Sequence, residues 1–148
     1  MIYHKQLWRF IVLDGYEIST IEGLGADKTE AAKSYLSNHN PNDINSFGVE
    51  WSRGLEGRDK RFMPYNGMIG DEQKAWFRET LEASSGSGES VVVLTHIGLH
   101  PQAVDNLCLL WNYQEILDII HETDSTVAVL SGHDHEVLHT NIFVTKLI

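Results

Sequence analysis

Apolar and polar positions along this chain fall into blocks that predict strands and helices in turn. Short apolar runs rich in β-branched residues predict three strands, at residues 9–14, 91–95 and 126–131. Helical spacing of apolar positions predicts three helices, at residues 26–38, 71–84 and 112–124. The second and third strands are continuously apolar, which is typical of parallel strands buried on both faces. Strands that alternate with helices in this way predict an α/β fold.

Two of the helical segments begin with a recognisable start signal. Asp27 with Glu30, and Asn112 with Glu115, have the spacing of a capping box, in which two side chains satisfy free backbone N–H groups. Both signals predict that a helix begins there.

The segments between these elements differ in character. Residues 38–70 hold much of the Gly, Asn and Pro without a sustained period, and predict a long irregular excursion of the kind that is more often functional than idle. In the helix that follows, Trp76, Phe77 and Leu81 can share one face. The sequence SSGSGES at residues 84–90 predicts a flexible link.

Composition narrows the class of protein without naming an activity. The chain has 148 residues, which suits one domain, and its formal net charge of −10 argues against a nucleic-acid partner. No apolar run approaches the ~20 residues of a membrane span, and the first residues do not have the pattern of a secretory signal. Cys108 is the single cysteine, which excludes an internal disulfide and favours the cytoplasm.

Three histidines follow two of the predicted strands. His96 comes directly after residues 91–95, and His133 and His135 come after residues 126–131 and a single glycine, Gly132. Ligands of open α/β sheets bind at the carboxyl ends of the strands, so we expect the three imidazoles to meet at one rim. Imidazole is a good ligand for zinc, manganese and iron, so the sequence predicts a metal site. We expect Gly132 to let the backbone turn sharply off the strand.

These motifs resemble those of a known superfamily. Thr95 and His96 after one strand, and Gly-His-Asp-His at 132–135 after the next, resemble the last two motifs of the calcineurin-like metallophosphoesterases. More specifically, three segments resemble the manganese-dependent ADP-ribose/CDP-alcohol diphosphatases: RFIVLDGYEIS (9–19), NGMIGDEQKAWF (66–77) and DNLCLLWNYQEILDIIH (105–121). The resemblance runs from about residue 2 to residue 135.

The resemblance implies a fold, a cofactor and a reaction. The fold is an αββα sandwich with two divalent ions at the sheet rim, of which this chain would be the C-terminal part, incomplete without the upstream half. His96 and His133 would bind one ion and His135 the other, with Mn²⁺ the expected metal. The reaction is hydrolysis of the diphosphate bond of ADP-ribose, CDP-alcohols or related nucleoside diphosphate derivatives. The expected partner is that small substrate, with no nucleic acid and no membrane, and the full-length enzyme is expected to be a cytoplasmic monomer.

The loop after His96 supplies candidates for shaping a nucleotide pocket: Asp105, Asn106, Cys108, Trp111 and Asn112. Packing of the long loop is the alternative role for these five residues. For Trp111 the two roles are equally favoured.

The sequence also departs from the family pattern. It lacks the family's Asp-x-His, Gly-Asp-x-x-Asp and Gly-Asn-His-Asp motifs, which supply the bridging aspartate, further ligands and the histidine that assists the leaving group, so no general acid is assigned. We therefore expect residues 1–135 to be a partial metallophosphoesterase domain and residues 136–148 a divergent tail. A partial gene model or spliced product, with Met1 an internal methionine, would explain this. The chain alone is expected to be inactive and poorly soluble.

Two other functions stay open at this point. One is a non-catalytic nucleotide-binding module, or truncated pseudoenzyme, which keeps the loop at 105–112 and does not use metals. The other is a zinc protein that holds a single ion with His96, His133 and His135.

Overall fold

The computed structural model describes residues 7–21, 25–46, 48–135 and 142–144 and is built on one four-stranded sheet. Its strands are β1 (Leu7–Leu13), β4 (Glu89–Thr95), β5 (Thr126–Ser131) and β6 (Ile142–Val144), in the order β1-β4-β5-β6. The first three are parallel, and β6 pairs antiparallel with β5. The predicted α/β class with a parallel sheet is confirmed.

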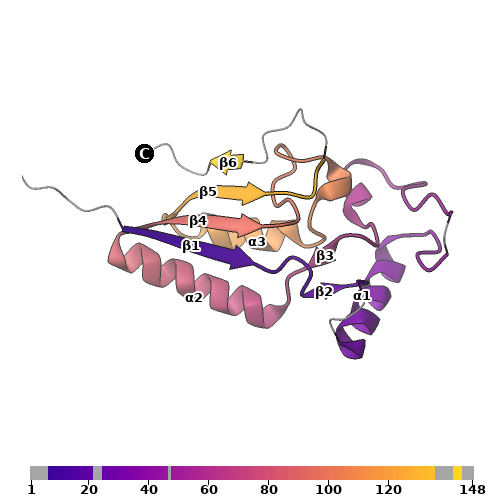
Figure 1. The fold of residues 1–148 in the computed structure, drawn as a ribbon, viewed down its shortest axis with the longest axis horizontal. Coiled ribbons are helices and arrows are strands. Elements are labelled where there is room, and N and C mark those ends of the chain that lie inside the picture. The colour runs from indigo at the N-terminus through magenta and orange to yellow at the C-terminus, as the bar shows by residue number, and fades with distance from the viewer. Residues whose placement is uncertain (1–6, 22–24, 47, 136–141, 145–148) are drawn as a thin grey trace, which may run out of the picture.

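All three parallel strands end at the same edge of the molecule. In Figure 1 the arrowheads of β1, β4 and β5 point toward the end of the molecule where β2, β3 and α1 lie. The register aligns Leu13 with Thr95 and Thr95 with Ser131, so the residues that follow these strands emerge side by side. This edge is the rim at which the sequence places its histidines.

Two helices cover one face of the sheet. They are α2 (Asp71–Ser87) and α3 (Tyr113–His121), and their apolar side chains form the main core with the inward residues of the strands. That core includes Ile11, Leu13, Val91, Val93 and Val129 from the sheet, Phe77 and Leu81 from α2, and Ile116, Ile119 and Ile120 from α3. Leu81 is fully buried, as its helical spacing predicts, whereas Trp76 is exposed, so the expectation that it shares the buried face is wrong.

The opposite face of the sheet is apolar and open. Phe10 is 67% and Val12 69% exposed, and their register partners on β4, Val92 and Leu94, are only half-buried. Burial of β4 and β5 on both faces was expected from their continuous apolar runs, but only the helix-covered face is fully buried. Parallel sheets are normally covered on both faces, so this face is unusual for a folded domain.

A second, smaller cluster lies beyond the rim. It is built from α1 (Ala26–His39), the two-stranded sheet of β2 (Ile18–Ser19) and β3 (Gly67–Met68), and a short 3₁₀ helix at Gly57–Arg61. Its buried core consists of Ala32, Leu36, Phe62 and Trp111. The predicted irregular excursion at 38–70 is thus confirmed, since after the end of α1 it contains only the short 3₁₀ helix and β3.

Three local expectations are wrong. Neither helix start uses its predicted capping box: α1 begins after Gly25 and α3 after Asn112, both without a side-chain cap. The side chain of Asn112 instead bonds to the backbone of Ile69. Residues 84–87 continue α2 as helix, and Gly88 caps its end in the left-handed conformation, so they are not a flexible link.

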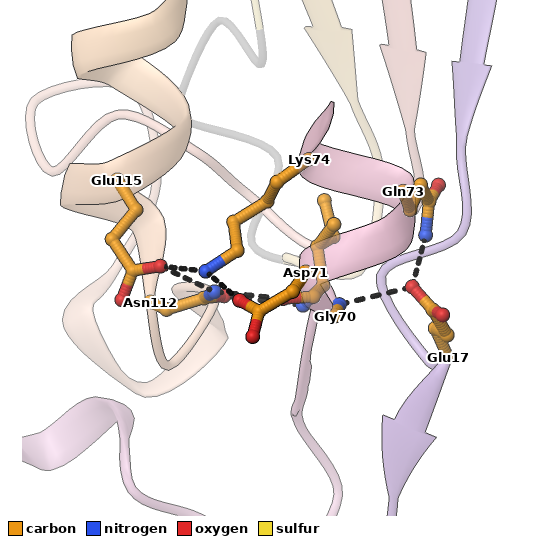
Figure 2. A network of polar contacts seen from close by, with 8 residues as sticks. Glu17, Gly70, Asp71, Gln73, Lys74, Asn112 and Glu115 are labelled. Atoms are coloured by element: carbon orange, nitrogen blue, oxygen red, sulfur yellow. Dashed lines mark hydrogen bonds and ion pairs between the residues drawn. The ribbon is translucent and has the colours of Figure 1, made fainter. Parts of the chain in front are cut away.

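A polar network fixes the start of α2 to its neighbours, as Figure 2 shows. Glu17, in the connection between β1 and β2, accepts hydrogen bonds from the Gly70 N–H and from Gln73 Nε2. Burial alone would raise the pKa of Glu17, but these hydrogen bonds and the nearby Lys28 together lower it. Lys74 bridges α2 to α3 by pairing with both Asp71 and Glu115. The network therefore orients the two covering helices next to the rim.

The expected tail at 136–148 lies outside the described residues except for β6, which extends the sheet beside β5. Within the described part of the chain, no helix is both long and apolar enough to cross a membrane.

Candidate metal centre

The structure brings two of the three predicted ligands together at the rim. His96 follows β4 and His133 follows β5, and their nitrogens His96 Nε2 and His133 Nδ1 lie 3.2 Å apart. The Gly132 N–H donates to the carbonyl of His96, which keeps the two strand ends aligned. Tyr16, in the turn after β1, lies beside both rings, with its hydroxyl 3.4 Å from His133 Nδ1. Each of the three parallel strands therefore contributes one side chain.

The turn after β5 has its unusual backbone at His133 rather than at Gly132. His133 has φ = 70° and is the one non-glycine residue with positive φ in the described ranges, whereas Gly132 is not among the positive-φ glycines. The left-handed residue of this turn is therefore His133 and not Gly132. A left-handed histidine costs roughly 1–2 kcal/mol, and such backbone strain tends to be kept where it aims a functional side chain.

Three neighbours set the charge state of His133. Burial is the main cause that lowers the pKa of this imidazole, and the proximity of His96 and then His135 lowers it further, while Asp134 acts in the opposite direction. The neutral ring is the form that has a free nitrogen lone pair for a metal ion. The local environment therefore favours the ligand form of His133 near neutral pH.

His135 does not join the other two imidazoles. It is exposed and lies on the wall of a pocket next to His133. Among the described residues there is no group of three or more His, Cys, Asp or Glu side chains placed to share a metal ion. The structure therefore offers one pair of imidazoles, with His135 set apart from it.

The pair fits one divalent ion. Two nitrogen ligands of the same ion lie roughly 3.0–3.4 Å apart when each is about 2.1 Å from it. The 3.2 Å between His96 Nε2 and His133 Nδ1 falls within this range. The same distance suits an N–H···N hydrogen bond when no ion is present. The two nitrogens are therefore spaced as two ligands of one ion would be.

The long loop after β4 is folded back so that its middle reaches the pair. Gly98 donates to the Cys108 carbonyl and accepts from the Leu110 N–H, which closes the loop on itself. The buried side chain of Asp134 accepts a hydrogen bond of 2.9 Å from the Asp105 N–H. This bond ties the loop to the turn that carries His133 and His135.

A pocket of about 290 Å³ lies between this loop and the histidine turn. Its walls are formed by Tyr65, Asp105, Leu107, Cys108, His133, Asp134 and His135. Burial, followed by the nearby Cys108 and Asp105, raises the pKa of Tyr65 to about 12, so its hydroxyl is a hydrogen-bond donor at neutral pH. The volume is at the small end for a ligand pocket.

The five candidates for the nucleotide pocket fall into two groups. Asp105 and Cys108 line the pocket, and Asn106 lies between them in the chain with its side-chain oxygen buried and without a partner in the described structure. Trp111 and Asn112 lie away from it. Trp111 packs in the cluster with α1 and donates from Nε1 to the Met63 carbonyl, and Asn112 bonds to Ile69.

The sequence patterns gave no indication of three residues at this rim. Tyr16 lies in a segment that reads as a turn, and Tyr65 and Asn66 lie in the irregular excursion at 38–70. The only signals near them were two segments of the family resemblance: RFIVLDGYEIS (9–19), which contains Tyr16, and NGMIGDEQKAWF (66–77), which begins at Asn66.

The fold defines the class of protein that the chain resembles. It matches the crystal structure of a dimetal phosphatase from Danio rerio with a TM-score of 0.76 and 31% sequence identity, over 86% of this chain and 40% of that one. A pair of neighbouring imidazoles at the ends of parallel strands fits that class.

Sequence similarity points to a narrower group. The manganese-dependent ADP-ribose/CDP-alcohol diphosphatase of Arabidopsis thaliana is 40% identical over 132 residues, which are 87% of this chain and 40% of that protein. The human protein of the same name is 37% identical over 134 residues, with 87% and 36% covered. No family model matches the chain. The resemblance inferred from the sequence motifs is confirmed, and the chain spans about 40% of the length of these relatives.

Proposed function

We propose that this chain forms part of a manganese-dependent diphosphatase that hydrolyses ADP-ribose, CDP-alcohols or related nucleoside diphosphate derivatives. The observation that carries the proposal is the His96–His133 pair, with ring nitrogens 3.2 Å apart at the rim of a fold that matches a dimetal phosphatase. The relatives whose names state this activity are up to 40% identical to the chain.

The residues of the chain would hold the metal and the substrate. His96 Nε2 and His133 Nδ1 would bind one Mn²⁺ ion, and His135 would contribute to the second. Bound divalent ions polarise the phosphoryl oxygens and supply a hydroxide near neutral pH. Asp105, Asn106 and Cys108 would shape the nucleotide end of the pocket, beside the Tyr65 hydroxyl, which can donate to a phosphate or ribose oxygen.

We further propose that the chain is inactive on its own. Two imidazoles that meet and one that stands apart provide no bridging carboxylate, and the described residues contain no larger ligand group. Two closely spaced divalent ions need anionic ligands to neutralise their charge. In the complete enzyme, which we expect to be a cytoplasmic monomer without nucleic-acid partners, further residues would supply these ligands.

A non-catalytic nucleotide-binding module is the second candidate. The pocket favours it, since the loop that carries Asp105, Leu107 and Cys108 is held by Asp134 and by backbone bonds, which do not involve His96 or His133. A zinc protein that uses all three histidines for one ion has less support, because His135 lies apart from the described pair.

Turnover and binding separate these functions. We expect no release of AMP from ADP-ribose by the chain with Mn²⁺, but AMP binding in calorimetry that weakens on chelation and in His133→Ala. His121→Ala is the matched control, because His121 is an exposed histidine at the end of α3, away from the rim. Binding that survives both the chelator and His133→Ala would favour the binding module. Manganese-dependent turnover would refute the proposed inactivity.

A further inference from the structure

Asn66 occupies a buried position directly behind the candidate metal centre. It precedes β3, is fully buried, and its side-chain Oδ1 lies 2.8 Å from His133 Nε2. His133 thus has a partner on each ring nitrogen: Asn66 on Nε2, and His96 with Tyr16 on Nδ1. The partner on one nitrogen of an imidazole determines which form the other nitrogen adopts.

The amide of Asn66 can be oriented in one way only. Its Nδ2 lies 2.9 Å from the Arg61 carbonyl and 2.8 Å from the Leu107 carbonyl, and both of these groups can only accept. The NH₂ group must therefore face these two carbonyls, because a reversed amide would place its oxygen against two other oxygens. The oxygen Oδ1 is left facing His133, where it can only accept a hydrogen bond.

An acceptor at this position fixes the proton on the ring of His133. A neutral imidazole has one N–H and one lone pair, so Nε2 must have the hydrogen in order to bond to Oδ1. The lone pair is then on Nδ1 and faces His96 Nε2 and the Tyr16 hydroxyl. With the opposite tautomer, a lone pair on Nε2 would oppose the lone pairs of Oδ1 inside a buried site.

We infer that Asn66 is a positioning residue that holds His133 as its Nε2–H tautomer, with the Nδ1 lone pair directed at the metal position. The metal part of this role rests on the proposed function, whereas the tautomer does not. The two carbonyls that orient Asn66 come from the excursion before β3 and from the pocket loop, at Arg61 and Leu107. Asn66 therefore connects the pocket wall to the orientation of the ligand ring.

Nitrogen NMR of the histidine rings reads the tautomer directly. The full chain is labelled with ¹⁵N-histidine, kept free of metal, and measured at pH 8, above the ordinary imidazole pKa of about 6.5. Comparison with His133→Gln, which lacks this ring, identifies the signals of His133. We expect wild-type His133 to show one protonated nitrogen, Nε2, and one unprotonated nitrogen, Nδ1. A wild-type ring that is protonated at Nδ1, or averaged between both forms, would overturn the inference without any variant.

Variants of Asn66 and of a second buried asparagine, Asn40, test the cause. Asn66→Ala should give a mixture of tautomers, because it removes the acceptor that faces Nε2. Asn40→Ala is the matched control, because Asn40 is also buried and its Nδ2 also donates to two carbonyls, Trp51 and Phe62, whereas its Oδ1 accepts from Asn42 and not from a histidine. It should leave the His133 signals unchanged. An unchanged Nε2–H signal in Asn66→Ala would refute the positioning role.

Titration of the same proteins with Mn²⁺ alone separates this inference from the proposed function. Loss of an outer partner of a ligand typically weakens metal binding about 10–100-fold, and we expect a loss of this size in Asn66→Ala but not in Asn40→Ala. A wild-type chain with the Nε2–H tautomer that binds no Mn²⁺ would overturn the proposed function and leave the tautomer assignment in place. Equal Mn²⁺ affinity in wild type and Asn66→Ala would overturn the metal part of the role.

Discussion

Because one face of the sheet is open, we predict that the same substitution changes the stability less on that face than on the face covered by α2 and α3. Val12 on β1 is 69% exposed, whereas Val93 on β4 is fully buried beneath α2 and α3. Valine and threonine have nearly the same shape, so Val→Thr replaces a methyl group by a hydroxyl at both positions. The loss of stability in each variant therefore reports how well that position is shielded from water.

The expected magnitudes follow from these exposures. A hydroxyl buried without a hydrogen-bond partner costs about 1–3 kcal/mol in proteins, so Val93→Thr should lower the free energy of unfolding by this amount. Val12→Thr places the hydroxyl in water and should change the free energy of unfolding by less than about 0.5 kcal/mol. Even the lower end of the Val93→Thr cost, about 1 kcal/mol, is about a fivefold change in the folding equilibrium constant.

Urea unfolding of both variants, followed by tryptophan fluorescence at several protein concentrations, measures the difference. Equal slopes with urea concentration would show that both variants unfold the same surface. A Val12→Thr cost as large as that of Val93→Thr would refute the reasoning, because it would mean that the β1 face is covered in solution. A cost that grows with protein concentration would identify self-association as the cover.

Further predictions concern the same face, two glycines and one carboxylate. The exposed apolar face should make the chain poorly soluble and bind a hydrophobic dye, and Phe10→Thr with Val12→Thr should reduce dye binding; a monodisperse monomer with no dye signal would contradict this. Gly67→Ala should destabilise the fold by about 1–3 kcal/mol or more, because its Cβ would lie 2.4 Å from the Gly15 carbonyl oxygen. Gly86→Ala, in open space on α2, should stabilise it by up to about 1 kcal/mol; thermal melts that reverse this order would disprove the argument. The pKa of Glu17 is lowered in the folded state below its ordinary value of 4.5, so its contribution is present above that pH and is lost as the pH falls through the folded pKa. Glu17→Gln should therefore lower the free energy of unfolding at pH 7 and make it fall less between pH 7 and about pH 3 than in the wild type. An equally steep fall in both proteins would count against this.

Much of the fold follows from periodicity along the chain. The strands at β1, β4 and β5 and the helices α2 and α3 are found where apolar runs and helical spacing place them. His96 and His133 could be brought together from sequence because each follows a buried strand, and adjacent parallel strands end at one rim. These features depend on local sequence and on a general rule of sheet topology.

Other features depend on contacts between distant segments. Asn66 reaches His133 across 67 positions of the chain, from an irregular segment with no period to indicate its direction. The left-handed backbone at His133 could not be expected, since the neighbouring Gly132 is the residue type that usually adopts it. Trp111 was equally consistent with pocket and core, and its place beside α1 depends on how the excursion at 38–70 folds back.

Binding of Mn²⁺ to the His96–His133 pair tests the central claim most directly. Electron paramagnetic resonance distinguishes free Mn²⁺ from bound Mn²⁺ in a titration of the full chain, without any need for turnover. We expect the wild type and His121→Ala to bind the ion equally, and His96→Ala and His133→Ala each to lose this binding, because each removes one of two nitrogens 3.2 Å apart. Undiminished binding in both His96→Ala and His133→Ala would contradict the account.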